Sequence, residues 1–436
     1  MSDAVCPSTV QTAAGLSTTS GIATGFSFSA REKETLRALA GRVGEIAARP
    51  EQAAKAALWT RHNDLEPSRP VVFCDPENGW NEIILQKDLE CTDPLARVWE
   101  MSLRKEIFWG ERMGDDRVVE PCFNVPFHYE DTHWGLQEKR IGGDRGGSYT
   151  WDVPLRDYDA DFAKLRFPEI RVDEEQSERS LALAHELFDG ELTVRRHTAW
   201  WWTLGMTWEY VTLRGLDNFM VDFYDNPEWV HKTMAFFRDG TLAKLEYLDG
   251  NGLLSSNVGD IYVGSGGFGW TRQLPRGGDA PTPAHPAGMW GFAESQETVG
   301  VSPDMFEEFV LPYQLPILER FGLNCYGCCE PLDARWRAVK RIPRLRRVSV
   351  SAWADREMMA ECLGGGYIYS WKPSPTPLSR PTLDRDAVRR AIRETLDIAA
   401  RGGCHVEIIM KDNHTLGGNP DNAVEWCRIA REEAAR

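Results

Sequence analysis

Three cysteines and a carboxylate stand close together in the C-terminal half of this chain. The run is Cys325-Tyr326-Gly327-Cys328-Cys329-Glu330-Pro331, and it starts inside an apolar stretch that is typical of a buried strand. Thiolate, imidazole and carboxylate are the usual zinc ligands, and a catalytic zinc takes three of them and keeps one position open. The run therefore predicts a metal site or a reactive thiol, with small thiols packed at a crowded strand end as the alternative.

A histidine from a distant part of the chain can complete such a site. His414 follows the apolar run 406–410, and strand ends meet at one mouth when a sheet closes into a barrel. Glu294 follows another predicted strand. It can act there as a third metal ligand or as a general acid, or it can form a structural ion pair. The predicted metal ligands are Cys325, Cys328 and His414, and the predicted catalytic side chains are Glu294, Cys329 and Glu330.

Other strand ends carry groups that can bind a substrate. Arg195 and His197 suit an anionic substrate, although an arginine there can equally form an ion pair inside the fold. The chain has 17 tryptophans, and Trp200–Trp202 and Trp353 predict an aromatic pocket or plain packing at the barrel rim. The predicted substrate-binding residues are Arg195, His197, Asn257, Trp353 and Lys372; Lys411 also follows a strand and receives no role.

These side chains need a scaffold that brings strand ends together. From about residue 190, short apolar runs alternate with helical patterns, which is the α/β signature. Units of ~25–40 residues, repeated about eight times, favour a closed (β/α)₈ TIM barrel. The Gly-rich run 264–269 is followed by no helix, so a dinucleotide-binding fold is disfavoured. The predicted strands are 70–74, 118–121, 192–197, 252–257, 289–294, 323–327, 348–351, 367–370 and 406–410.

The remaining segments divide the chain into three parts. Residues 1–29 predict a flexible N-terminal arm that can serve an oligomer contact, residues 30–69 a helical extension, and residues 70–436 the barrel. The Gly/Pro-rich loop 259–286 is predicted to cover the barrel mouth together with Trp200–Trp202 and Trp353, as lids do.

Composition excludes several classes of protein. The 436 residues carry a net charge of −16, which repels nucleic acid, and no stretch is apolar enough to span a membrane. Ten cysteines in a chain of this length do not indicate a disulfide scaffold. We expect a cytoplasmic protein with reduced thiols, acting on a small molecule, with a homo-oligomer as an open expectation.

The order of several motifs resembles the uroporphyrinogen decarboxylase superfamily, which includes cobalamin-dependent methyltransferases. The resemblance runs from about residue 70 to the C-terminus. It rests on Arg214-Gly215-Leu216-Asp217-Asn218-Phe219-Met220, Asp225-Asn226-Pro227-Glu228-Trp229-Val230-His231, Val301-Ser302-Pro303-Asp304-Met305-Phe306, the Cys-rich run and Gly364-Gly365-Gly366-Tyr367-Ile368.

The methyltransferase branch implies a zinc held by a His-x-Cys pair and a late cysteine. Tyr326-Gly327-Cys328 stands at the first place and Asn413-His414 at the second, so only Cys328 matches and His414 would substitute. Cys329 or Glu330 would supply the missing ligand. The decarboxylase branch implies an Arg-rich motif after the first strand, whereas this chain has Cys74-Asp75-Pro76 there.

Three functions follow as hypotheses. The first is a zinc-dependent methyltransferase that moves a methyl group between a corrinoid, methylcobalamin or a methylated small molecule and a thiol or tetrahydrofolate-type acceptor, with a corrinoid protein as partner. The second is a metal-free decarboxylase or lyase acting on a small carboxylate or tetrapyrrole-like substrate. The third is a non-catalytic protein that grips a corrinoid or porphyrin between its aromatic side chains.

Overall fold

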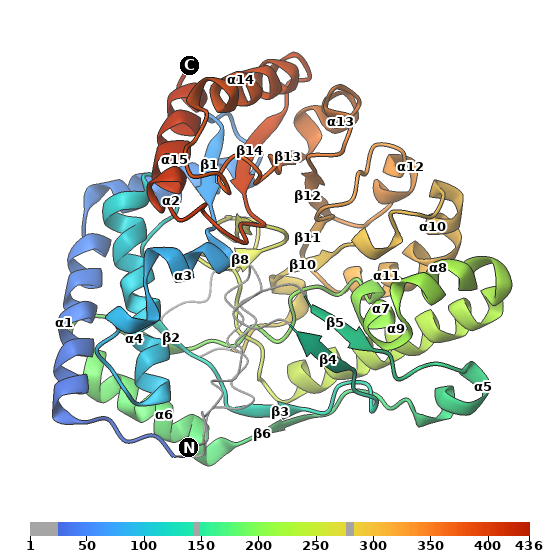
Figure 1. The fold of residues 1–436 in the computed structure, drawn as a ribbon, viewed down its shortest axis with the longest axis horizontal. Helices are drawn as coiled ribbons and strands as arrows, with labels where there is room; N and C mark the ends of the chain where they lie inside the picture. Colours follow the sequence, from blue (N-terminus) through green and yellow to red (C-terminus); the bar gives the residue numbers. More distant parts are fainter. Residues whose placement is uncertain (1–24, 143–148, 276–282) are drawn as a thin grey trace.

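The computed structural model describes residues 25–142, 149–275 and 283–436 (Figure 1). Most of the predicted flexible arm, residues 1–24, lies outside the described residues. The last residues of that arm are packed rather than loose, because Phe26 and Phe28 are buried and the Phe28 ring meets Trp99 edge to face at 5.3 Å.

A parallel sheet of six strands forms the centre of the molecule. Its order is β1-β14-β13-β12-β11-β10, so strands from the two ends of the barrel segment lie side by side. Nearly every residue of these strands is buried, as expected for a parallel sheet covered on both faces. The strands are β1 (Val71–Cys74), β10 (Trp290–Ala293), β11 (Leu323–Tyr326), β12 (Leu345–Val350), β13 (Ile368–Trp371) and β14 (His405–Met410).

Strand pairing does not close this sheet into the predicted eight-stranded barrel. β2 (Cys122–Val125) pairs in parallel with β7 (Thr193–Arg196) as a separate ladder, and it begins after the predicted strand 118–121 has ended. The predicted strand 252–257 makes no ladder; instead the Asn257 side chain bonds to the backbone of Trp290 at 2.8 and 2.9 Å. The fold is therefore a mixed α/β fold with a parallel sheet.

One face of the sheet is covered by helices from the C-terminal half. Val72 and Cys74 point to this face and share a core with Trp426 and Cys427 of α15. Figure 1 shows these helices outside the curved row of strands. They are α10 (Pro303–Phe309), α11 (Leu311–Leu318), α12 (Trp336–Val339), α13 (Arg356–Leu363), α14 (Arg385–Arg401) and α15 (Asp421–Ala434).

The other face is covered by a short hairpin, β8 (Tyr262–Val263) and β9 (Gly267–Phe268) (Figure 1). Phe268 packs with Val71 and Phe73, which alternate with the outward residues of β1. At the base of the hairpin the Phe268 and Trp270 carbonyls accept hydrogen bonds from Asn63, at the N-terminal end of the sheet. The described start of loop 259–286 therefore fills the inner face of the sheet from its N-terminal end instead of closing over the mouth as a lid, and only its tip at Ser265 reaches the C-terminal end.

The predicted helical extension is present as α1 (Ala30–Ala47) and α2 (Pro50–Asn63). Ser29 caps α1, and Glu32 completes a capping box that satisfies two free backbone N–H groups. Leu36 and Val43 then fall on one buried face, packed with α4 (Pro94–Phe108), α6 (Glu174–Phe188), β2 and β7. These elements form a second apolar core beside the main one.

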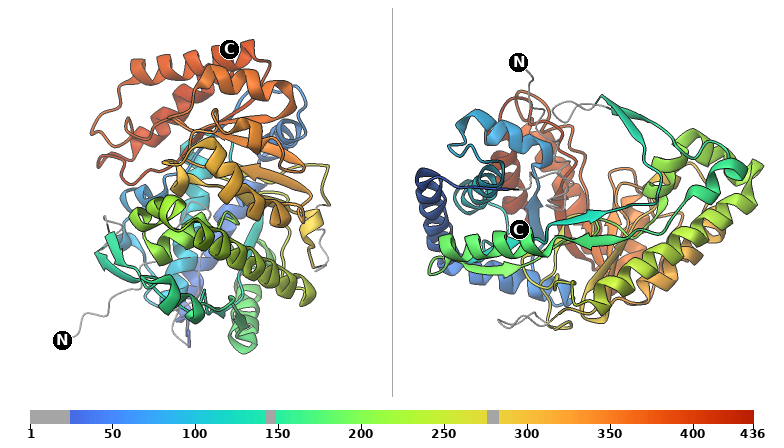
Figure 2. Two further views of the ribbon diagram at one scale, coloured as in Figure 1. Left: turned by 90° about the vertical axis from the view of Figure 1, so that its right-hand side faces the viewer. Right: turned by 90° about the horizontal axis from the view of Figure 1, so that it is seen from below.

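Three further helices lie on the opposite side of the molecule from α1 (Figures 1 and 2). They are α7 (Thr207–Arg214), α8 (Leu216–Asp225) and α9 (Pro227–Gly250). The antiparallel pair β4 (Lys139–Gly142) with β5 (Tyr149–Asp152) lies near these helices, and the pair β3 (Tyr129–Asp131) with β6 (Ile170–Val172) runs along the bottom of Figure 1, between α6 and these helices.

Within the described ranges, no helix is both long and apolar enough to cross a membrane.

Candidate active site

The Cys-rich run leaves the sheet through a turn that only glycine suits. β11 ends at Tyr326, and Gly327 has a φ of 89°, in the left-handed region that side chains with a Cβ avoid. A Cβ on Gly327 would also collide with Leu332. This turn sends Cys328 back toward the end of the sheet, where it is buried with only 2% of its surface exposed.

Cys328 lies against a buried lysine and a serine from the hairpin. Its Sγ is 3.3 Å from Nζ of Lys411, which follows β14, and 3.2 Å from Oγ of Ser265 at the hairpin tip. Lys411 is also 3.2 Å from that serine oxygen. Three segments that are far apart in the sequence thus surround one thiol.

Cys329 continues the cluster toward solvent. Its Sγ lies 3.5 Å from Cys328 Sγ and 3.3 Å from Oδ2 of Asp412, and Asp412 Oδ1 is 3.2 Å from Lys411 Nζ. The hydrogen bond from Cys329 lowers the pKa of Cys328 below that of an ordinary thiol. Lys411 and Ser265 lower it further, whereas burial raises it. The same hydrogen bond raises the pKa of Cys329, so Cys328 is the thiol of the pair that ionises first.

Lys411 is the matching cation. Burial works against its charge, yet Cys328 and Asp412 raise its pKa well above the ordinary value of 10.5. A buried charge is stable only when it is paired, and here each ion supplies the other's partner. The cluster is therefore a buried cysteine–lysine pair at the C-terminal end of the sheet, in which the lysine favours the thiolate form of Cys328.

Two glutamates flank the pair with different contacts. Glu330 is fully buried and accepts hydrogen bonds from the backbone N–H groups of Ser295 and Cys328, each at 2.8 Å, so it braces the two loops after β10 and β11. Burial, and then Cys328, raises the pKa of Glu330 to about 7. Glu294 is also fully buried, and burial raises its pKa well above 4.5, with Glu297 adding to the shift. Burial therefore favours the protonated form of Glu294.

Several buried polar atoms around the pair have no hydrogen-bond partner among the described residues. They are Oε1 of Glu294, Oε1 of Glu77, Oη of Tyr262 and Oδ1 of Asn413. Buried polar atoms are normally satisfied, and unsatisfied ones often mark a ligand or an ordered water. These atoms are therefore available to a ligand or to ordered water.

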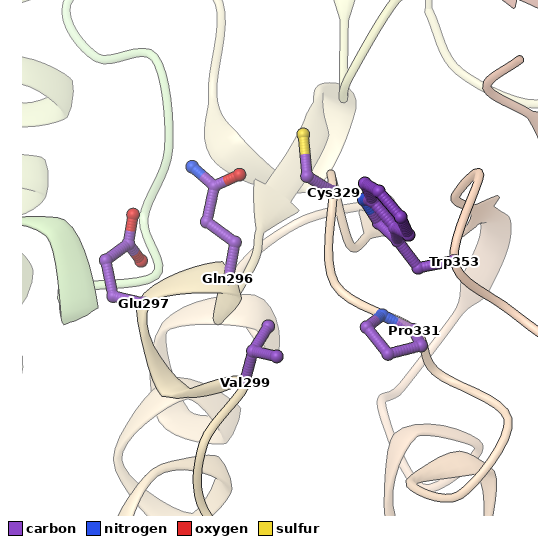
Figure 3. Close-up of a pocket in the computed structure, with 6 residues that line it drawn as sticks. All are labelled: Gln296, Glu297, Val299, Cys329, Pro331 and Trp353. Atoms are coloured by element: carbon purple, nitrogen blue, oxygen red, sulfur yellow. The ribbon is translucent and has the colours of Figure 1, made fainter. Parts of the chain in front are cut away.

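A pocket of about 600 Å³ opens next to Cys329 (Figure 3). Figure 3 shows Cys329 and Trp353 on one side and Gln296 and Glu297 across the open space. The Trp353 side chain is 79% exposed, so its indole is free to contact a bound molecule. The pocket is lined by Gln296, Glu297, Val299, Cys329, Pro331 and Trp353.

Deeper in the sheet, a second charged network holds strands and hairpin together. Glu407 on β14 accepts hydrogen bonds from Arg347 at 2.9 Å and from Ser370, and its other oxygen lies 3.1 Å from His62. Arg347 also donates to the Cys325 sulfur at 3.4 Å. Burial opposes the Glu407 charge, but Arg347 and His62 together lower its pKa far below 4.5.

The predicted metal ligands do not come together. Cys325 contacts Arg347 and Cys328 contacts Lys411, while His414 is exposed and its backbone carbonyl accepts a hydrogen bond from the Asn78 side chain. Across the described ranges, no group of three His, Cys, Asp or Glu side chains is arranged to hold a metal ion. A catalytic zinc needs such a set, so these residues do not fit one.

The predicted substrate-binding residues are scattered. Trp353 lines the pocket beside Cys329. Lys372 is buried with its Nζ on Ser370, and burial lowers its pKa to about 8. Asn257 bonds to Trp290, as described above. Arg195 bonds to Asn124 at 2.7 Å beside β2, and His197 is half-buried next to it, with a pKa lowered by burial to about 3.

The tryptophan triplet does not line this pocket either. Trp200 is buried with its Nε1 on the Leu253 carbonyl, and Trp202 packs on Phe292. Sequence reasoning also gave no role to Lys411, Ser265 or Tyr262. The position of Lys411 directly after an apolar strand is a signal that could have assigned it to the site. Ser265 and Tyr262 give no such signal, because they lie in a Gly/Pro-rich loop whose composition is equally typical of a surface lid.

Comparison with known proteins bears on the fold alone. No family model matches this chain, and no curated protein matches it. Among solved structures, a methyltransferase from Methanosarcina mazei is similar, with a TM-score of 0.50 and 12% identity, over 87% of this chain and 98% of that one. This chain therefore resembles that structure in fold, and at this identity the likeness leaves the activity to be argued from the site.

Proposed function

We propose that this protein is a methyltransferase that moves a methyl group from a corrinoid or a methylated small molecule to a thiol, through the sulfur of Cys328. The observation that carries the proposal is the position of the buried Cys328 sulfur, 3.3 Å from Nζ of Lys411 and 3.2 Å from Oγ of Ser265. A thiolate is the nucleophile that attack on a methyl carbon requires. The fold shared with a methyltransferase is consistent with this choice.

The first half of the reaction places the methyl group on Cys328. The thiolate attacks the methyl carbon of the donor, a carbon–sulfur bond forms, and the donor–methyl bond breaks with its electron pair left on the donor. Glu294 has a raised pKa and one oxygen without a hydrogen-bond partner in the described part of the chain, so we assign it as the acid that gives a proton to the departing atom.

The second half restores the enzyme. The sulfur of the acceptor thiol attacks the same methyl carbon, and the Cys328 carbon–sulfur bond breaks with its electron pair returning to Cys328. Lys411 stabilises the thiolate that leaves, and the proton of the acceptor thiol reprotonates Glu294. The sum is one methyl group moved from donor to thiol and one proton moved from thiol to donor.

Zinc and a corrinoid remain predictions from the sequence. The residues around Cys328 do not offer a zinc ligand set, so no step above uses a metal. The acceptor is proposed to enter through the pocket beside Cys329 and Trp353, because the Cys329 sulfur in its lining lies 3.5 Å from the Cys328 sulfur.

A turnover assay tests the proposal. Loss of methylcobalamin absorbance in the presence of 2-mercaptoethanol should be seen with the wild type and should disappear in Cys328→Ser. Cys362→Ser, on α13, is the matched control and should keep its rate. The wild-type rate should survive dialysis against a chelator; a rate that falls to zero and returns with zinc would restore the metal-dependent mechanism.

A metal-free lyase is the second candidate, and the buried cations favour it. Lys411 and the unpartnered hydroxyl of Tyr262 could hold a substrate carboxylate at the same place. This function needs no nucleophilic sulfur. Release of carbon dioxide from a carboxylate substrate that is unchanged in Cys328→Ser would select the lyase.

A further inference from the structure

A second pocket lies beside α7 and α9, separate from the Cys328 cluster. Its volume is about 290 Å³, enough for a small molecule. Thr207, at the start of α7, bonds to Glu297 at 2.7 Å, so the two pockets are neighbours but have no lining residue in common. The lining includes Asp131, Trp134, Glu138, Arg140, Trp201, Trp208, Glu209, Thr212 and Lys244.

One carboxylate in this pocket has no salt-bridge partner among the described residues. Asp131 pairs with Lys244 at 2.6 Å, and Glu138 pairs with Arg140 at 3.3 Å. Glu209 makes no salt bridge within the described part of the chain, and its buried Oε2 has no hydrogen-bond partner there. Thr212, on the same face of α7 nearly one turn later, has an unpartnered hydroxyl as well.

Three indole rings share the pocket with that carboxylate. They belong to Trp134, Trp201 and Trp208. The face of an indole attracts a cation, and several aromatic rings beside one carboxylate are how proteins recognise ammonium groups without a strong hydrogen-bond donor. A neutral or anionic ligand would leave the Glu209 charge without a partner.

We propose that this pocket binds a small organic cation, an amine or a methylated ammonium, between the indoles and Glu209. The proposal concerns binding alone and does not rest on methyl transfer. Burial raises the pKa of Glu209 to about 7; Glu297 and Asp131 act in the same direction and Lys244 opposes them. A bound cation favours the ionised carboxylate, so binding releases a proton and strengthens as pH rises through 7.

Isothermal titration calorimetry with choline tests the site, with 3,3-dimethylbutan-1-ol as the neutral probe of the same shape. The wild type should bind choline at least about tenfold more tightly than the neutral probe. Glu209→Gln and Trp208→Leu should each weaken choline binding by about tenfold or more. Affinity should rise between pH 6 and pH 8 in the wild type and stay flat in Glu209→Gln.

Two controls locate the bound choline. Glu138→Gln removes a carboxylate of the same pocket that already has a cation partner, and it should bind within about twofold of the wild type. Trp353→Leu alters the other pocket and should also bind like the wild type. The proposal is overturned if the wild type shows no choline binding at millimolar concentration, if Glu209→Gln binds as well as the wild type, or if Trp353→Leu alone abolishes binding.

Discussion

Lys411 is the residue on which the proposed chemistry depends most. It is the cation that faces Cys328, and its removal would leave a buried thiolate without a partner. Lys411→Met should lower kcat by about 10²–10³, the usual loss when one charge-stabilising donor is removed. Lys87→Met, which changes an exposed lysine, is the control and should be silent.

The pH profile separates this role from a purely structural one. Without Lys411 the pKa of Cys328 rises, so the remaining activity of Lys411→Met should climb with pH where that of the wild type is level. Equal pH profiles for the two proteins would show that the lysine does not act through the thiolate.

Glu407 is the second residue whose substitution has a predictable effect, in this case on the stability of the fold. It links Arg347 and Ser370 of the sheet to His62 of α2, and Glu407→Gln leaves the Arg347 charge uncompensated. We expect a loss of about 3–5 kcal/mol in the free energy of unfolding. Glu357→Gln, in an exposed pair with Arg401, should cost about 0.5 kcal/mol or less in the same denaturation experiment.

The loss of stability at acid pH shows whether Glu407 is ionised in the folded protein. The folded-state pKa of Glu407 lies below its ordinary value of 4.5, so its contribution is present above that pH and is lost as pH falls below it. Wild-type stability should therefore drop on acidification more steeply than that of Glu407→Gln. Parallel curves would contradict the assignment of Glu407 as a buried ion.

At the scale of elements, the β8–β9 hairpin brings the inner face of the sheet and the site together. Its backbone passes so close to Arg347 that a Cβ on Gly267 would collide with the guanidinium. Gly267→Ala should destabilise the protein by about 1–3 kcal/mol and lower activity, because Ser265 at the tip would move away from Cys328.

Gly366→Ala is the matched control for that substitution. A Cβ at Gly366 would meet nothing within 4 Å, so thermal denaturation and turnover should both match the wild type. If Gly267→Ala melts and turns over like the wild type, the hairpin does not position the site.

The elements that the sequence predicts well are those with a clear period. The run of α1 residues Leu36, Val43 and Ile46 indicated a helix, and the apolar runs at β11 to β14 indicated buried strands. The hairpin was missed because its two strands are each two residues long and lie in a Gly-rich segment. Contact between Lys411 and Cys328 depends on the strand order, which local pattern does not encode.

At the scale of the whole molecule, burial differs sharply between sheets. β11, β13 and β14 are buried along almost their whole length, whereas β4 is exposed at every residue. Hydrogen exchange followed by mass spectrometry should show slow exchange in β11 to β14 and exchange that is faster by orders of magnitude in β4 and β5. Equal protection in the two sheets would contradict this arrangement.

The same scale explains why the closed barrel was predicted and is not shown. Strand and helix alternate along the chain as a barrel requires. Beside β10, however, the Asn257 side chain makes the hydrogen bonds that a neighbouring strand's backbone would make, and β2 pairs with β7 in a separate ladder. The apolar pattern of a sequence does not distinguish such a side-chain contact from a strand. The predicted metal ligands fail to meet for a related reason. Strand ends that converge at one mouth need not point their side chains at the same spot.

The central claim is that the methyl group passes through the sulfur of Cys328. The most direct measurement is mass spectrometry of the wild-type protein after incubation with ¹³C-labelled methylcobalamin and no acceptor thiol, followed by acid quench and digestion. The account predicts one labelled methyl group on the peptide that contains Cys328, absent in Cys328→Ser and removed when 2-mercaptoethanol is added before the quench. Methyl transfer to 2-mercaptoethanol that proceeds with no label on Cys328, or with label on another residue, would contradict it.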